Sequence, residues 1–160
     1  MARATGSAPV RSRGWRTGSP VRPPVRRTTG PEVRIPLDVD TLLAANQAYY
    51  DAFEAADLDA MSDVWEHSER VVCTHPGWST LRGWASVTAS WVAIFGASQR
   101  LQFILTEPLP EIVGEVGWVS VNENVLGAAD GTTIAALNVF VHHDDRWAMV
   151  AHHAGQVVGS

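Results

Sequence analysis

The feature that most constrains this chain is a change in the spacing of its apolar residues near Gly96. Before that glycine, apolar residues recur every three to four positions, as they do on one face of an amphipathic helix. After it, runs rich in β-branched and aromatic residues alternate with short turn sequences, which is typical of strands. Helices followed by strands predict an α+β fold, with the helices packed on one face of a curved sheet.

Three helices are predicted before the change in spacing. The first follows a cap at Asp38 or Asp40 and runs for about 17 residues, with its apolar side chains in one stripe. Asp57 has the position of a cap for a second, shorter helix. The third is expected over residues 83–95, where Gly96 ends it.

Four strands are predicted after Gly96, over residues 99–107, 112–126, 132–143 and 147–158. The short connections between them imply antiparallel hairpins rather than crossover units. The breaks carry turn chemistry, at Pro108 and Pro110, at Asp130-Gly131 and at Asp144-Asp145.

Charge divides the chain into two parts. Residues 1–34 hold eight of the twelve arginines and a single acid, whereas the remainder holds four arginines and sixteen acids. We therefore expect a disordered basic Arg/Pro-rich tail over residues 1–35 and one acidic folded domain over residues 36–160. The tail is interpreted as a solvated extension or a translated leader upstream of the true start. The alternative is a basic arm for nucleic acid or an anionic membrane.

Several classes of function have no support in the residues. The 160-residue chain has one cysteine and no lysine, so an internal disulfide and Schiff-base chemistry on a lysine are excluded. It has no G-x-G-x-x-G sequence, no P-loop and no metal-ligand spacing, so we expect neither a cofactor nor a metal. It has no apolar run near the roughly 20 residues that span a bilayer and no signal peptide, so we expect no membrane partner and a cytoplasmic location. An acidic domain also argues against nucleic acid as its partner.

The stretch over residues 73–91 is the first candidate for a site. A short buried strand ends at Cys73, His75 begins a turn with Pro76 and Gly77, and a helix rich in large aromatic residues follows. The turn holds one imidazole between a strand and a helix, so we expect His75 to face a pocket.

Several segments together resemble the nuclear transport factor 2-like superfamily, and within it the SnoaL-like and ketosteroid-isomerase-like proteins. The resemblance covers about residues 37–158 and rests on residues 46–61, 73–78, 81–83, 90–91, 137–140 and 146–153. It implies a cone of three helices wrapped by a strongly bent, mixed and mostly antiparallel sheet. Such a cone encloses a pocket, and the protein is usually a homodimer.

The same resemblance implies three catalytic residues. Ketosteroid isomerases pair a carboxylate base with an oxyanion hole made of a tyrosine and a protonated aspartate. His75 falls on the base position, Tyr49 on the tyrosine position and Asn138 close to the aspartate position. An imidazole keeps basicity near neutral pH, and an amide can still donate a hydrogen bond. Either Tyr49 or Tyr50 can be the inward residue.

Other residues are expected to bind the substrate. Asn122 and Asn124 share one face of their strand and Glu123 lies on the other, so only one set can line a pocket, and we expect Asn122 to do so. Of the pair His152-His153, we expect His153 at the pocket or at a dimer face. The aromatic candidates for the pocket wall are Trp78, Trp91 and Trp118.

Two functions follow as hypotheses. The first is an isomerase, dehydratase or cyclase that binds a small apolar or carbonyl-containing molecule and uses His75 as general acid or base. The second is a non-catalytic module that binds an apolar ligand or associates as a dimer. For such a module we expect Val119, Val121 and Val125 on an apolar sheet face that packs across the dimer.

Overall fold

The structure is a computed structural model, and it describes residues 37–97, 101–126 and 132–157. The chain divides into two units, Met1–Glu32 and Val33–Ser160, and every element below belongs to the second. The predicted tail of residues 1–35 and the predicted turn at Asp130-Gly131 lie outside the described residues.

The helices begin and end where their capping residues predict. Asp38 accepts a hydrogen bond from the Thr41 N–H at 2.8 Å and caps the first helix, whereas Asp57 caps the second. Gly83, with a φ of 78°, precedes the third. No helix within the described ranges is long and apolar enough to cross a membrane. The helices are α1 (Val39–Ala55), α2 (Leu58–Val64) and α3 (Trp84–Phe95).

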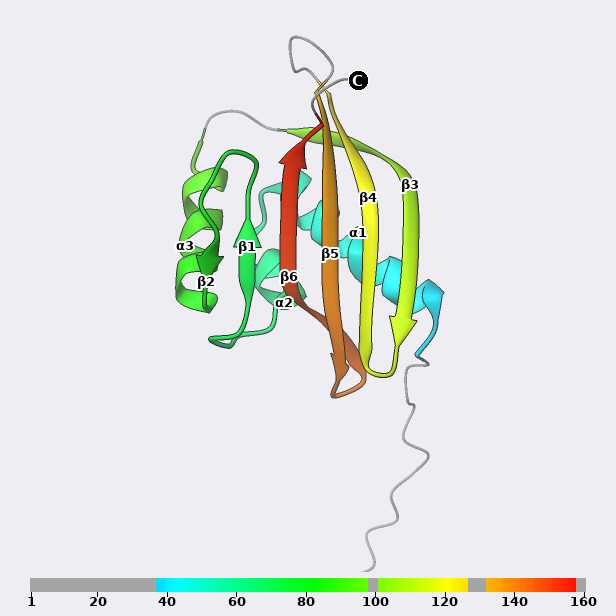
Figure 1. Ribbon diagram of the computed structural model, residues 1–160. Coiled ribbons are helices and arrows are strands. Elements are labelled where there is room, and N and C mark those ends of the chain that lie inside the picture. Colours follow the sequence, from blue (N-terminus) through cyan, green and yellow to red (C-terminus); the bar gives the residue numbers. More distant parts are fainter. Residues whose placement is uncertain (1–36, 98–100, 127–131, 158–160) are drawn as a thin grey trace, which may run out of the picture. The chain divides into compact units, whose positions relative to one another are not determined.

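Six strands form one curved, unclosed sheet in the order β2-β1-β6-β5-β4-β3. β1 runs parallel to β6, and every other neighbouring pair is antiparallel. In Figure 1, α1 crosses one side of the four long strands and α3 lies beside β1 and β2. The α+β prediction, with three helices against a mixed sheet, is confirmed. The strands are β1 (Val72–Thr74), β2 (Leu81–Arg82), β3 (Gln102–Val113), β4 (Val116–Leu126), β5 (Thr133–His143) and β6 (Arg146–Gln156).

The predicted break at Pro108 and Pro110 is wrong, because both prolines lie inside β3. β3 is the edge strand of the sheet, where a missing N–H costs no ladder hydrogen bond on the open side. The register shifts between Thr106 and Leu109, and Glu107 between them has a φ of 53°, so the strand bulges at the prolines without ending.

The hairpin turns use residues with positive φ. The chain turns from β3 to β4 at Gly114, with a φ of 60°, followed by Glu115. Between β5 and β6, Asp144 and Asp145 have φ values of 49° and 57°, which is the backbone of a two-residue hairpin turn. The turn predicted at Asp144-Asp145 is therefore confirmed.

Alternation along β4 decides which residues enter the core. Val119, Val121, Glu123 and Val125 are buried, while the residues between them are only partly buried. The expectation that these valines form an exposed sheet face is wrong, because they belong to the buried core that includes residues of α1. The opposite face of the sheet is the one that meets solvent.

Candidate functional site

A cavity of about 270 Å³ lies against α1, the turn after β1, and the long strands. Its volume is just below the range of about 300–1,000 Å³ found for many ligand pockets. The walls are mainly apolar and aromatic, and two tyrosines, two histidines and one glutamate bring polar groups to them. The lining residues are Tyr49, Tyr50, Phe53, His75, Pro76, Trp78, Ile94, Leu101, Phe103, Glu123, Val125, Ile134 and His152.

His75, in the turn after β1, lines this cavity. Its Nε2 lies 2.9 Å from the Ser90 hydroxyl, and that hydroxyl donates its own proton to the Val87 carbonyl at 2.7 Å. Ser90 must therefore accept from His75, which places the imidazole proton on Nε2 and the lone pair on Nδ1. Burial lowers the pKa of His75 to about 4, so its ring is neutral at pH 7.

Tyr49 brings a hydroxyl to the same cavity. Its ring is 2% exposed and packs edge-on against Tyr50 and Trp91. The hydroxyl forms no hydrogen bond to any residue within the described ranges, so a bound molecule could accept from it. Burial raises the pKa of Tyr49 well above its ordinary value, which keeps that proton in place.

A chain of buried hydrogen bonds forms the polar wall of the cavity. The Tyr50 hydroxyl donates to Glu123 Oε1 at 2.8 Å. The Asn138 amide N–H₂ donates to the Tyr50 hydroxyl at 3.0 Å and to Asn46 Oδ1 at 2.8 Å. His152 Nδ1 donates to Asn138 Oδ1 at 2.7 Å, because that oxygen can only accept. The wall thus links residues of α1, β4, β5 and β6.

Two titratable groups of this wall have pKa values far from their usual range. Burial raises the pKa of Glu123 to about 7, although the hydrogen bond from Tyr50 works in the opposite direction. Burial lowers the pKa of His152 to about 3, and the nearby His75 and His153 act in the same sense. His152 is therefore a neutral imidazole at pH 7, while Glu123 is divided between its two protonation states.

The tryptophans differ in their relation to the cavity. Trp78 lines it, remains 47% exposed and lies 5.2 Å from the His75 ring, so it belongs to the rim. Trp91 does not line it but lies beneath the wall, with its ring 4.7 Å from His75 and 5.7 Å from Tyr49. Trp118 lies on the far face of β4, because its buried neighbours Gly117 and Val119 point the other way.

The structure places Asn122, Asn138 and His153 differently from the expectation. Asn122 lies on the outer face of β4 and donates to Glu107 Oε2 at 2.9 Å. His153 is exposed, and its neighbour His152 is the inward member of the pair. Asn138 is a fully buried member of the polar wall that does not line the cavity, and both of its amide protons are used. In each strand, adjacent side chains point to opposite faces, and packing against α1 selects the face.

Sequence reasoning does not identify Ser90, and it leaves Tyr50, Glu123 and His152 as the unchosen alternatives to their neighbours. Glu123 carries a signal that could have been found, because it interrupts a row of alternate valines at 119, 121 and 125 that marks the buried face. A lone acid in such a row is unusual, since glutamate is rarely buried without a specific role. The Ser90 contact has no comparable signal, because His75 and Ser90 meet only through the packing of α3.

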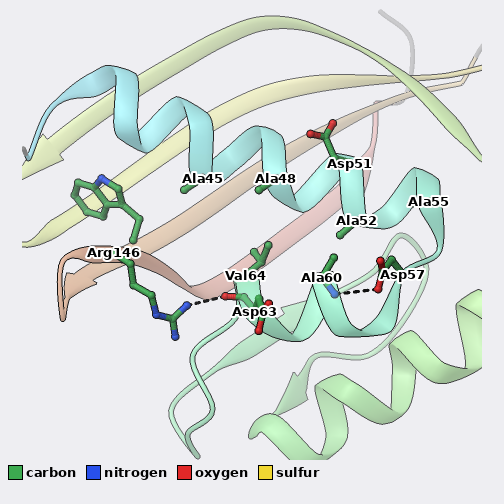
Figure 2. Close-up of a pocket in the computed structure, with 11 residues that line it drawn as sticks. Ala45, Ala48, Asp51, Ala52, Ala55, Asp57, Ala60, Asp63, Val64 and Arg146 are labelled. Carbon is green, nitrogen blue, oxygen red and sulfur yellow. Dashed lines mark hydrogen bonds between the residues drawn. The ribbon is translucent and has the colours of Figure 1, made fainter. Parts of the chain in front are cut away.

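A second, larger groove of about 580 Å³ lies along α1 and α2. Figure 2 shows that its floor is mostly alanine side chains, with Arg146 and several aspartates at the edges. Three of these polar groups have structural partners: Asp51 accepts from Gln47, Asp57 accepts from the Ala60 N–H, and Arg146 donates to the Asp63 backbone carbonyl. The groove therefore offers a ligand fewer unpaired polar groups than the cavity at His75 does.

No group of three histidine, cysteine or acidic residues within the described part of the chain could hold a metal ion. Cys73 Sγ lies 3.7 Å from Nε2 of the His75 ring. Burial raises the pKa of Cys73 to about 12, so the sulfur is a thiol at pH 7.

The model of a SnoaL-like domain matches residues 42–159 of this chain. The chain belongs to the SnoaL-like family. A structure from Streptomyces avermitilis, a candidate dehydratase of the NTF2-like family, is 32% identical to this SnoaL-like chain. The match covers 76% of this chain and 97% of that one, with a TM-score of 0.70. Membership of the NTF2-like superfamily, predicted from the sequence, is confirmed.

Two other similar proteins are not described as dehydratases. A candidate association domain of calcium/calmodulin-dependent protein kinase type II from Thiobacillus denitrificans is 34% identical, with a TM-score of 0.67. That match covers 74% of this SnoaL-like chain and 96% of the other. The F-box protein SKIP8 of Arabidopsis thaliana is 27% identical over 71% of this chain, and the match spans only 48% of SKIP8.

Proposed function

We propose that this SnoaL-like domain binds a small hydrophobic carbonyl compound and transfers a proton on it, as an isomerase, dehydratase or cyclase does. The observation that carries the proposal is His75, a buried neutral imidazole on the cavity wall whose Nε2 proton is held by Ser90. Its Nδ1 has only a long 3.9 Å contact with the Cys73 sulfur. A substrate proton can therefore be taken by Nδ1.

Tyr49 supplies the second part of the proposed chemistry. Removing a proton next to a carbonyl group places negative charge on the carbonyl oxygen. The free, protonated hydroxyl of Tyr49 can donate to that oxygen. The aromatic and aliphatic lining keeps water away, and this strengthens the hydrogen bond to a developing charge.

Asn138 has a different role from the one the resemblance implied. Its two amide protons bind Asn46 and Tyr50, so they are not directed to a ligand. We propose that Asn138 orients Tyr50 and His152 instead. The 32% identical structure described as a candidate dehydratase supports chemistry of this general kind.

The proposal is tested by the exchange of α-protons of small ketones in D₂O, followed by NMR with cyclohexanone, acetophenone and 2-tetralone. The wild-type chain should accelerate exchange for at least one ketone. His75→Gln keeps a side chain that can donate to Ser90 but removes the base, and it should lower the enzymatic rate by about 10²–10⁴-fold.

The matched control is His153→Gln, because His153 is the exposed histidine next to the cavity residue His152. It should leave the exchange rate within about twofold of wild type. No exchange above the buffer rate with any of the ketones, or equal rates for wild type and His75→Gln, would contradict the proposal.

A second candidate function is association of copies of the chain, with or without a ligand in the cavity. The 34% identical structure described as a candidate kinase association domain favours it. The solvent-facing side of the long strands also carries large apolar residues, among them Ile104 and Leu137. We propose a homodimer through this face, and its test is given at the scale of the whole molecule below.

A further inference from the structure

The polar wall of the cavity has a definite direction of hydrogen bonding. Asn138 uses both N–H groups on Asn46 and Tyr50, at 2.8 and 3.0 Å, and accepts from His152 Nδ1 with its oxygen. The Tyr50 hydroxyl accepts this hydrogen bond from Asn138 and donates one to Glu123. The side-chain protons of Tyr50 and Asn138 and the Nδ1 proton of His152 are thereby used between protein groups.

With Glu123 ionised, the groups left facing the cavity are acceptors. Glu123 then accepts from Tyr50 through Oε1, and its Oε2 bonds no residue within the described ranges, although the side chain is only 5% exposed. His152 donates through Nδ1, so a neutral ring carries a lone pair on Nε2, which likewise bonds no described residue. Both residues line the cavity. Neither atom is among the fully enclosed side-chain atoms without a partner, so both can be reached from the cavity, and a ligand that donates to them gains hydrogen bonds.

The charges of the lining residues also favour a ligand that donates hydrogen bonds and is not an anion. The described lining residues include no arginine, and the chain contains no lysine. Nothing among them would offset the charge of a carboxylate or phosphate placed beside Glu123. An anionic ligand would therefore lose its hydration and meet a like charge.

We propose that the cavity selects a small apolar ligand that carries a hydroxyl or amino group as hydrogen-bond donor to Glu123 and His152, and that it rejects anions. This inference rests on the proposed function and names its substrate class. The carbonyl group of such a ligand lies at Tyr49 and His75, and its hydroxyl or amino group lies at Glu123 and His152. The cavity of about 270 Å³ suits a ring compound of modest size.

The test uses the full chain and four probes that share one ring: benzyl alcohol, benzylamine, benzaldehyde and benzoate. Their dissociation constants are measured by NMR titration at about pH 8.5, where Glu123 is ionised. Benzyl alcohol and benzylamine should bind about five- to tenfold more tightly than benzaldehyde, which only accepts hydrogen bonds. Benzoate should bind most weakly.

Glu123→Gln provides a reversal that a merely structural role would not produce. The amide oxygen can still accept from Tyr50, and the amide N–H₂ then faces the cavity in place of Oε2. The preference for benzyl alcohol over benzaldehyde should disappear or reverse, and benzylamine should lose the most affinity. The matched control is Glu111→Gln, an exposed glutamate of β3, which should keep the wild-type order.

Three results would overturn the inference: benzoate binding most tightly, benzaldehyde binding as well as benzyl alcohol to the wild type, or no binding of any probe at about 20 mM. The dissociation constants of the four probes for the wild type test the inference even if Glu123→Gln does not fold. The probes need not react, so failure here leaves proton transfer at His75 standing. If the protein does not accelerate ketone exchange but still prefers hydrogen-bond donors, proton transfer is contradicted and the ligand preference stands.

Discussion

At the scale of single residues, the site depends on groups whose protonation is set by burial. His75 and His152 stay neutral because the interior penalises their charged forms. Glu123 has an elevated pKa for the same reason, since no described cation lies against it and one hydrogen bond from Tyr50 offsets only part of the penalty. The protein therefore maintains an acid at the cavity wall at a cost in stability.

That cost should appear as a pH-dependent effect of Glu123→Gln. Below pH 4.5 the glutamate is protonated in both the folded and the unfolded state, and no penalty applies. From pH 4.5 to about 7 the unfolded state loses its proton first, so the stability of the wild type falls as pH rises. Above pH 7 the penalty is complete.

We therefore expect Glu123→Gln to be about 2–3 kcal/mol more stable than wild type at pH 8 and nearly equal at pH 4. Urea unfolding at both pH values measures this difference. The exposed control Glu111→Gln should stay within about 0.5 kcal/mol of wild type at both. A pH-independent effect of Glu123→Gln would contradict the assignment.

At the scale of elements, α1 and the sheet approach closely at one place. Gly117 of β4 faces α1, and a Cβ built there would lie 2.9 Å from Leu42 Cδ2 and 3.1 Å from the Trp147 ring. Leu42 is fully buried and Trp147 is 6% exposed, so neither has room to move away. The absence of a side chain at this position lets the helix lie against the strand.

Gly117→Ala should destabilise the domain by about 1–3 kcal/mol, because the added methyl group must displace packed side chains. Gly155→Ala on β6 is the matched control, since nothing lies within 4 Å of a Cβ at that position. It should be neutral or slightly stabilising. Chemical denaturation of the two variants measures the difference, and equal stabilities would show that α1 adjusts freely.

At the scale of the whole molecule, the open face of the sheet is the surface available for association. It carries Leu137, 41% exposed, which is paired with the partly buried Ser120 of β4 and the exposed His153 of β6. Ile104 and Leu109 on β3 are 51% and 65% exposed. Apolar groups clustered on one sheet face are a common feature of surfaces that bind another protein.

If copies associate through this face, Leu137→Glu should convert a dimer into a monomer, because the carboxylate would be buried without a partner. Light scattering after gel filtration measures the mass. Leu58→Glu is the control, since Leu58 is 40% exposed but lies on α2. If the wild type is a monomer, or if the dimer persists in Leu137→Glu, association through the sheet is contradicted.

Local chemistry in the sequence was enough to predict much of the fold. Asp38 and Asp57 cap helices, Asp144 and Asp145 turn a hairpin, and His75 follows a strand and lines the cavity. Each of these depends on residues a few positions apart, whose geometry the chain determines locally. The resemblance, rather than helical spacing, indicates Tyr49 as a site residue with Tyr50 as the alternative, and both line the cavity.

The tertiary structure alone decided which sheet face is the interior and which residues meet across it. Alternation divides His152 from His153 but does not say which member is buried; packing against α1 does. For Asn122 and Glu123, the alternate valines mark the buried face, and only the packing places that face at a cavity. The pairing of His75 with Ser90 and of Asn138 with Tyr50 joins segments far apart in the chain. Such contacts, and the pKa values that burial produces, depend on long-range packing that no local pattern encodes.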